Sequence, residues 1–182
     1  GMMSLCANTT SSNNVAVGKF ALRYNTTANG NVAVGHSALC ANTTATGNTA
    51  VGCEALKANT DQINNTAIGL QVLASNTTGS SNTGLGAQAL LANTSGYQNT
   101  AIGRIALCSN TSGDHNIAVG DRAMVSNTTG CYNIGIGPAA GYLTTTGMCN
   151  VAIGTCSNYQ NITGGASVFM GYLAGFYNNA GP

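Results

Sequence analysis

Hydrophobic and polar residues follow one another along this chain with a fixed period of 17 residues. A glycine marks each repeat and returns ten times without an insertion or a deletion. The repeat glycines are Gly18, Gly35, Gly52, Gly69, Gly86, Gly103, Gly120, Gly137, Gly154 and Gly171. Each copy must stack directly on the one before, because a single extra residue would put every later side chain out of line. The order of the residues therefore excludes a disordered chain.

Four other positions of the repeat carry nearly constant residue types. A strand Asn column, four residues before each glycine, comprises Asn14, Asn31, Asn48, Asn65, Asn82, Asn99, Asn116, Asn133 and Asn150. A turn Asn column, seven residues after it, comprises Asn25, Asn42, Asn59, Asn76, Asn93, Asn110 and Asn127. A Val/Ile column directly before it comprises Val17, Val34, Val51, Ile68, Leu85, Ile102, Val119, Ile136, Ile153 and Met170. A Leu column, four residues after it, comprises Leu22, Leu39, Leu56, Leu73, Leu90, Leu107 and Met124.

A repeat of this length predicts one coil of a parallel β-solenoid, since 17 residues are too few for a helical hairpin repeat. The segment Asn-Thr-Ala-Val-Gly at 48–52 has β-branched residues at alternate places, as a strand does, and its glycine allows a turn with positive φ. We expect the next Ala-Leu pair to form a second short strand and the Asn-Thr-Thr-Gly segment to form the return turn. The predicted fold class is all-β, a β-roll or β-helix of ten coils.

Stacking in register also predicts what fills the interior. Identical side chains from successive coils would lie about 4.8 Å apart. We expect the Val/Ile and Leu columns to form buried apolar spines, in which each Val or Ile contributes about 1.5–3 kcal/mol. We expect the two Asn columns to form amide ladders. Such a ladder is satisfied only where every rung is Asn, since an orphan amide costs about 1–3 kcal/mol.

Charge is scarce and lies outside these columns. The chain has 5 Lys and Arg residues, 4 Asp and Glu residues and a net charge of +1. No basic cluster is present to bind nucleic acid or an anionic membrane surface. No apolar run approaches the ~18 residues of a membrane-spanning helix. We therefore expect no nucleic-acid partner and no membrane insertion.

Small residues dominate the predicted coil, so its core is thin. A slender solenoid with apolar columns on two edges needs partners to cover them, and we expect a parallel homotrimer. The whole chain, residues 1–182, is expected to form a single solenoid domain. Its coils are expected to be regular over about 1–137 and modified, with aromatic residues, over about 138–182.

The run Asn-Thr-Ala-Val-Gly at 48–52, with counterparts at 65–69, 99–103 and 150–154, resembles repeats of two related groups of fibrous proteins. One group is the head repeats of trimeric autotransporter adhesins, whose coils are shorter. The other is the repeat of phage tail-fibre-like proteins and related bacterial surface proteins, which the segment 65–79 resembles more closely. The resemblance covers nearly the whole chain. It implies a trimeric, left-handed β-roll that serves as a shaft or adhesive head on a virion fibre or cell surface, joined to neighbouring fibre segments.

The sequence offers little catalytic chemistry, and we expect the protein not to be an enzyme. Glu54 is the only glutamate, so the paired carboxylates of a glycosidase are not evident. Ser112, Asp114 and His115 suggest a catalytic triad only by adjacency, and a solvated turn explains them better, because a triad is defined by its geometry. No P-loop and no zinc-type Cys-x-x-Cys spacing occurs, so we expect no cofactor and no metal.

The 7 cysteines follow the repeat and, being odd in number, do not indicate a disulfide framework. Cys131 and Cys149 fall in adjacent coils, where a disulfide is geometrically possible. Together with His115 they lie on one edge in successive coils. Small residues scattered in a turn explain this edge better than a metal site does.

The columns change character over the last three coils. Leucine gives way to Gly141, Asn158 and Gly175, and Phe169 replaces the usual alanine. Aromatic residues follow the former leucine positions: Tyr142, Tyr159, Phe176 and Tyr177. We expect them to fill the space that leucine leaves or to cap the open end of the solenoid. The alternative is a patch for contact with a cell-surface glycan or a protein receptor, since exposed aromatic residues commonly serve in binding.

These observations favour a structural fibre or adhesin-type module that mediates attachment. An ice-binding solenoid is the alternative, because threonine stands eight residues after the repeat glycine. This Thr column comprises Thr26, Thr43, Thr60, Thr77, Thr94, Thr111, Thr128 and Thr145. A tailspike that degrades polysaccharide is a less favoured third class, because carboxylates are scarce.

Overall fold

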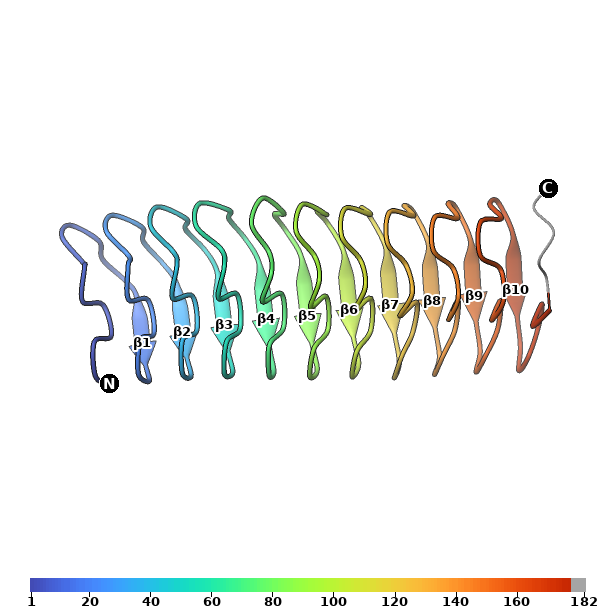
Figure 1. The fold of residues 1–182 in the computed structure, drawn as a ribbon, viewed down its shortest axis with the longest axis horizontal. Coiled ribbons are helices and arrows are strands. Elements are labelled where there is room, and N and C mark those ends of the chain that lie inside the picture. Colours follow the sequence, from blue (N-terminus) through green and yellow to red (C-terminus); the bar gives the residue numbers. More distant parts are fainter. Residues whose placement is uncertain (178–182) are drawn as a thin grey trace.

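The computed structural model describes residues 1–177, which wind into a rod of stacked coils (Figure 1). Ten strands of three residues form one parallel sheet, and each strand pairs with the next along the chain. The strands are β1 (Val15–Val17), β2 (Val32–Val34), β3 (Thr49–Val51), β4 (Thr66–Ile68), β5 (Thr83–Leu85), β6 (Thr100–Ile102), β7 (Ile117–Val119), β8 (Ile134–Ile136), β9 (Val151–Ile153) and β10 (Val168–Met170). The predicted parallel β-solenoid with a 17-residue repeat is confirmed. The left-handed winding and the threefold assembly stay predictions.

Successive strands pair so that equivalent residues of the repeat lie side by side. Ala33 is opposite Ala16 in β1 and β2, and Ala50 follows in β3. The ladder continues past the strand ends, where the Gly35 N–H donates to the carbonyl of Val17 at 2.8 Å. Each coil is therefore bound to both neighbours through its backbone, and register is fixed along the whole rod.

The repeat glycines are required by the backbone at the end of each strand. Their φ angles lie between 120° and 138°, a region that side chains other than glycine rarely adopt. A Cβ added at Gly18 would stand 2.6 Å from the carbonyl oxygen of Gly35 in the next coil. Gly1 extends this column by one coil, since its Cβ would stand 2.6 Å from the oxygen of Gly18.

The middle residue of each strand points into the coil and meets the Leu column. This Ala column comprises Ala16, Ala33, Ala50, Ala67, Gly84, Ala101, Ala118, Gly135, Ala152 and Phe169. Leu39, Leu56 and Leu90 are fully buried, as the sequence predicts for the Leu column. The core is therefore a narrow strip of alanine and leucine inside the coil.

The Val/Ile column lies on the outside of the sheet, so the prediction that it forms a buried spine is wrong. Val17 is 58% exposed, and Leu85 and Ile102 are 44% and 37% exposed. Side chains of a strand alternate between its two faces, and alanine occupies the inner one. The residues on either side of that alanine must therefore face outward, where the single chain leaves them uncovered.

The predicted second strand at the Ala-Leu pair is also wrong, because this segment is a series of turns. Leu22 has a φ of 48°, and Phe20, two residues earlier, has a φ of 64°. Residues with ordinary negative φ separate them, so the chain turns at every second residue instead of extending. A turn bond, donated by the Ala21 N–H to the Gly18 carbonyl at 3.4 Å, closes the first of these bends. The predicted return turn after the turn Asn column is confirmed.

Both predicted Asn ladders are present in the interior. In the strand Asn column, Oδ1 of Asn31 accepts the backbone N–H of Asn48 at 2.9 Å, and Nδ2 of Asn48 donates to the Gln62 carbonyl at 2.8 Å. In the turn Asn column, Nδ2 of Asn93 donates to Oδ1 of Asn76 at 2.9 Å. Each amide therefore joins two coils and also anchors a return turn.

The turn Asn ladder breaks at two places, and each break leaves a buried oxygen without a partner. Oδ1 of Asn42 is unpaired, because Nδ2 of Asn59 donates only to the Gln62 carbonyl of its own coil, whereas Nδ2 of Asn93 donates both to its own coil and to Asn76. Oδ1 of Asn127 is unpaired where Thr144 takes the place of the next Asn. The break at Thr144 agrees with the expectation that a buried amide ladder needs Asn at every rung, whereas the break at Asn42 occurs between two Asn residues.

Two glycines in the Ala column are matched by larger residues that fill the space of the missing methyl group. A Cβ added at Gly84 would collide with Cγ1 of Val72, which occupies a position that is alanine in the neighbouring coils. A Cβ added at Gly135 would stand 2.7 Å from Cγ of Met124, the last member of the Leu column. Core volume is therefore conserved within a coil even where the residue types change.

The pair of Val72 and Gly84 provides a test of this close packing. We expect Gly84→Ala to lower the free energy of unfolding by about 1–3 kcal/mol, because it overpacks the coil. Adding Val72→Ala should recover most of that loss, because it recreates the two alanines of the next coil, Ala89 and Ala101. Denaturant unfolding of the two single variants and the double variant measures the coupling. Strictly additive effects would contradict this account of the packing.

Candidate functional site

The structure brings together the aromatic residues that the sequence singles out. The rings of Tyr142 and Tyr159 stack with centroids 4.8 Å apart and an interplanar angle of 4°. Phe176 stacks on Tyr159 at 4.7 Å and 13°, and Tyr177 meets Phe176 edge-on at 4.8 Å. We name these four residues the aromatic stack. It runs along the rod axis on the flank of the last three coils.

The aromatic stack stands where the inner Leu column is lost. Gly141, Asn158 and Gly175 occupy the leucine positions of these coils, and each is followed directly by a member of the stack. The rings of the first three members are half-buried and Tyr177 is 78% exposed. Contact between coils therefore shifts by one residue, from aliphatic side chains inside to aromatic rings on the flank. These rings do not swing into the core.

Phe169 points inward near the open end, as the sequence suggests for an aromatic residue there, and is partly buried. It stands in the Ala column, and a Cβ added at Gly175 would collide with its ring. Glycine in the Leu column thus makes room for phenylalanine in the Ala column. The expected filling of leucine's space therefore holds for Phe169 and not for Tyr142, Tyr159 or Phe176.

Stacking decides which parts of the aromatic rings can meet a ligand. The facing surfaces of Tyr142, Tyr159 and Phe176 cover one another at centroid distances of 4.7–4.8 Å. A sugar ring that packs on an aromatic face would find these inner faces occupied. What remains accessible is ring edges, the tyrosine hydroxyls and the exposed ring of Tyr177. Contact with a receptor would therefore depend on hydrogen bonds and edges, with Tyr177 as the one largely free ring.

A second aromatic group, which the sequence reasoning missed, lies on another edge of the rod. The ring of His115 stacks on Tyr132 at 4.8 Å and 17° and meets Tyr97 edge-on at 5.2 Å. These three residues stand at the same or neighbouring positions of successive repeats, a signal that the 17-residue alignment contains. Asp114 accepts the Tyr97 backbone N–H at 2.9 Å. His115 is therefore held between aromatic rings.

The cysteines form no disulfide, and two of the thiols, Cys40 and Cys108, are shielded by partial burial. All 7 cysteines are free, including Cys131 and Cys149, so the disulfide that their spacing allows is not formed. Burial raises the pKa of the Cys108 thiol, and burial also raises that of Cys40 against the opposing charges of Arg23 and Lys57. A raised pKa disfavours the thiolate, which is the reactive form. Within residues 1–177, no three His, Cys, Asp or Glu side chains come together as a possible metal site.

The charged residues form exposed ion pairs. Nζ of Lys57 lies 3.0 Å from Oε1 of Glu54, and Nε of Arg104 lies 2.9 Å from Oδ1 of Asp121 in the next coil. A hydrogen bond from Gln71, and then one from Lys57, lowers the pKa of Glu54. Exposed pairs of this kind add little stability. The lowered pKa keeps Glu54 ionised, which does not suit a general acid.

The Thr column uses its hydroxyls to join coils. The hydroxyl of Thr94 donates to the Thr111 carbonyl at 3.0 Å, and that of Thr111 donates to the Thr128 carbonyl at 3.1 Å. The pattern is interrupted at Thr60, whose hydroxyl donates to Oδ1 of Asp61 at 3.2 Å. The hydroxyl protons of these threonines are therefore used in hydrogen bonds within the protein.

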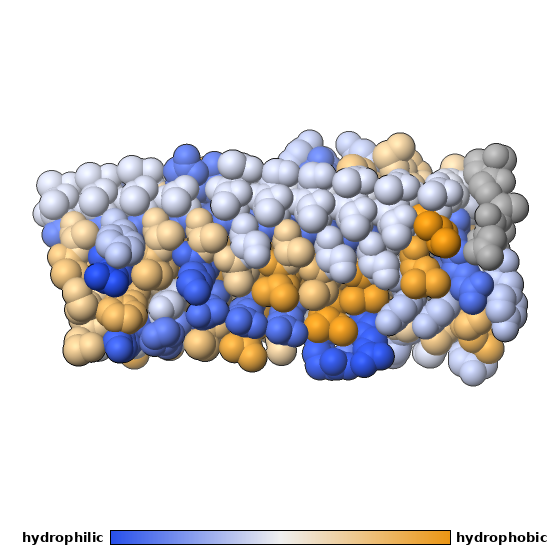
Figure 2. Space-filling view, viewed as in Figure 1, coloured by the Kyte–Doolittle hydropathy of each residue, from blue (hydrophilic) through white to orange (hydrophobic). Residues whose placement is uncertain are grey.

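Figure 2 shows a face on which hydrophobic (orange) and hydrophilic (blue) patches are mixed below a pale band that runs the length of the rod.

The aromatic stack can be tested by removing its central ring. We expect Tyr159→Ala to lower the free energy of unfolding by about 1–3 kcal/mol, because it removes two stacked contacts of about 0.5–1.5 kcal/mol each. Tyr172 is a matched control, since it is 75% exposed and belongs to no aromatic pair among the described residues. Thermal unfolding and near-ultraviolet circular dichroism would measure the change. Equal losses for Tyr159→Ala and Tyr172→Ala would show that the stack contributes nothing.

Comparison with known proteins finds no family model, no curated protein and no solved structure that matches the chain. Over residues 1–177 the structure contains no helix that is long and apolar enough to cross a membrane. The case for a function therefore comes from the exposed columns of the solenoid itself.

Proposed function

We propose that the protein is a structural fibre or adhesin-type module, the shaft or head of a viral tail fibre or a bacterial surface adhesin that mediates attachment. The observation that carries this proposal is an uncovered apolar surface along the whole parallel sheet. Its repeating geometry suits assembly into a long, stiff fibre. Such a module acts as a stiff spacer and presents side chains along its length.

The apolar surface consists of the outward side chains of the ten strands, and we name it the strand face. One of its columns is the Val/Ile column. The other, at the first position of each strand, comprises Val15, Val32, Thr49, Thr66, Thr83, Thr100, Ile117, Ile134, Val151 and Val168. Neither column contains a charged residue. The Val/Ile column is apolar along all ten strands, and the first-position column is Val or Ile except for Thr in β3, β4, β5 and β6. An uncharged, largely apolar face of this length exceeds what a soluble monomer usually leaves uncovered.

The partner that fits the strand face best is another copy of the same chain. The face repeats at the spacing of parallel strands, about 4.8 Å, so a partner must repeat with that spacing to fill every groove. A parallel second copy meets this condition at all ten coils. The threefold symmetry is what the resemblance to trimeric fibre repeats implies. A parallel homotrimer would bury Val17, Leu85 and Ile102, which the single chain leaves exposed.

Attachment needs a contact for a receptor as well as a shaft. The aromatic stack, Tyr142, Tyr159, Phe176 and Tyr177, is the proposed contact for a cell-surface glycan or a protein receptor. The partly exposed tyrosine edges and the largely free ring of Tyr177 support this assignment. A place on a virion fibre or on the cell surface, next to further fibre segments, follows from the proposed role.

An ice-binding solenoid is the second candidate, and a different column now supports it. The hydroxyls of the Thr column donate to carbonyls, but Thr49, Thr66, Thr83 and Thr100 lie on the strand face in consecutive coils. A regular threonine array on a flat sheet is the geometry that this alternative needs. Thermal hysteresis separates the two functions. The fibre proposal predicts none, and clear activity would favour ice binding.

Molar mass by light scattering tests the proposed assembly. We expect a mass about three times the 18.1 kDa of one chain. Ile102→Glu should give a monomer with unchanged far-ultraviolet circular dichroism, because the charge would be buried in the apolar interface. Ser95→Glu, at an exposed position of the same coil outside the strand face, is the matched control and should keep the trimer. A monomeric unmodified protein, or a trimeric Ile102→Glu variant, would contradict the role of the strand face.

A further inference from the structure

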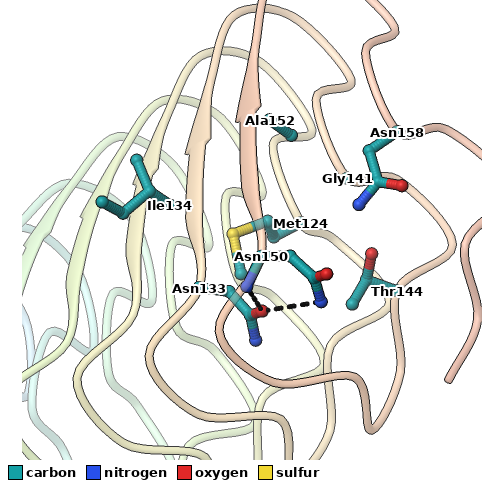
Figure 3. Close-up of a pocket in the computed structure, with 8 residues that line it drawn as sticks. All are labelled: Met124, Asn133, Ile134, Gly141, Thr144, Asn150, Ala152 and Asn158. Carbon is teal, nitrogen blue, oxygen red and sulfur yellow. Dashed lines mark hydrogen bonds between the residues drawn. The ribbon is translucent and has the colours of Figure 1, made fainter. Parts of the chain in front are cut away.

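The interior of the solenoid contains a cavity where the Leu column ends. Met124 is followed, one coil later, by Gly141, which has no side chain to continue the column. The cavity leaves about 10 Å³ for the centre of a water molecule. It is lined by Met124, Asn133, Ile134, Gly141, Thr144, Asn150, Ala152 and Asn158 (Figure 3).

Three buried polar atoms at this cavity have no partner in the protein. They are Oγ1 of Thr144 and both amide atoms, Oδ1 and Nδ2, of Asn158. Thr144 is 2% exposed and Asn158 is 1% exposed. Buried polar groups are nearly always hydrogen-bonded, since an unpaired one costs about 1–3 kcal/mol. Both side chains line the same cavity although they belong to successive coils, so one small ligand inside it can lie between them.

The other polar side chains at the cavity are already engaged. Oδ1 of Asn133 accepts both the backbone N–H of Asn150, at 3.0 Å, and Nδ2 of Asn150, at 3.1 Å, as Figure 3 shows. Nδ2 of Asn150 also donates to the Gly164 carbonyl at 2.8 Å. The strand Asn ladder therefore passes the cavity intact and leaves Thr144 and Asn158 as the groups that need a ligand.

The chemistry of these atoms identifies the ligand. Nδ2 of Asn158 needs an acceptor, whereas Oδ1 of the same amide needs a donor. A cation would leave the donor unpaired and an anion would leave the acceptor unpaired. A water molecule is both donor and acceptor, and one water needs about 10–15 Å³ of such space and two to four polar partners. We propose that the cavity beside Gly141 is a binding site for one ordered water that bridges Asn158 and Thr144.

A bound water at this point changes how the last coils are held together. Leucine contacts join the earlier coils, whereas a hydrogen-bonded water and the aromatic stack join the coils of Met124, Gly141 and Asn158. The junction between these coils therefore lacks the leucine packing that the earlier coils have. Gly141 and Asn158 stand at leucine positions of the repeat. The loss of leucine there explains both the buried cavity and the aromatic stack outside it.

A crystal structure of the whole protein at a resolution that shows ordered water tests the proposal. We expect one water peak within hydrogen-bond distance, about 2.7–3.2 Å, of Thr144 Oγ1 and of the Asn158 amide. The variant Gly141→Leu/Asn158→Leu restores the Leu column and should lose the peak. It should also raise Tm by at least about 2 °C, because leucine packing replaces orphan polar groups.

The matched control is Leu90→Ala, which opens a cavity of the same column among apolar neighbours. That cavity should remain dry, since an apolar void does not hold water, and Tm should fall. The proposal is overturned if the unmodified protein shows no peak between Thr144 and Asn158, or if the two side chains bond directly. It is equally overturned if the peak survives in the double leucine variant. Whether the protein assembles as a trimer does not affect these outcomes.

Discussion

Every feature of this solenoid depends on one constraint, that equivalent residues of successive coils must lie beside one another. Backbone bonds fix this register, and the buried amides reinforce it, because Nδ2 of Asn93 donates to Oδ1 of Asn76 in one neighbouring coil and Oδ1 of Asn93 accepts Nδ2 of Asn110 in the other. The constraint explains why a change at one rung affects its neighbours. Thr144 leaves Oδ1 of Asn127 without a partner, and Oδ1 of Asn42 is unpaired because Nδ2 of Asn59 does not donate to it.

Each strand has only three residues, so only its middle side chain points into the coil. Alanine points inward, so the coil is too narrow to hold more than a strip of alanine and leucine, and the larger Val/Ile side chains are turned out. A core of that size gains limited stability from burial. The uncovered strand face follows from the same geometry, and it is the reason that the proposed role is assembly into a fibre rather than action as a single chain.

The sequence predicts those parts of the fold that depend on residue identity at a fixed spacing. The 17-residue coil, the parallel sheet, both Asn ladders, the return turn and the grouping of Tyr142, Tyr159 and Phe176 are of this kind. The outward direction of Ile102 was missed because its hydrophobicity favours burial. The side chains of a strand alternate between its two faces, however, and the inner face is occupied by the preceding alanine. The turns at Leu22 were missed because a φ of 48° is unusual for leucine and is imposed by the closed coil. The orphan atoms of Asn158 depend on three-dimensional contacts that spacing does not encode.

The distance between coils tests the central claim of register most directly. Spin labels at Thr26→Cys paired with Thr94→Cys, Thr111→Cys or Thr145→Cys, in a variant with the 7 native cysteines replaced and diluted with unlabelled chain, would be measured by double electron–electron resonance. Four, five and seven coils separate these pairs, so the account predicts distances of about 19, 24 and 34 Å, a linear rise of about 4.8 Å per coil. Distances that do not grow in proportion to the number of coils would contradict it.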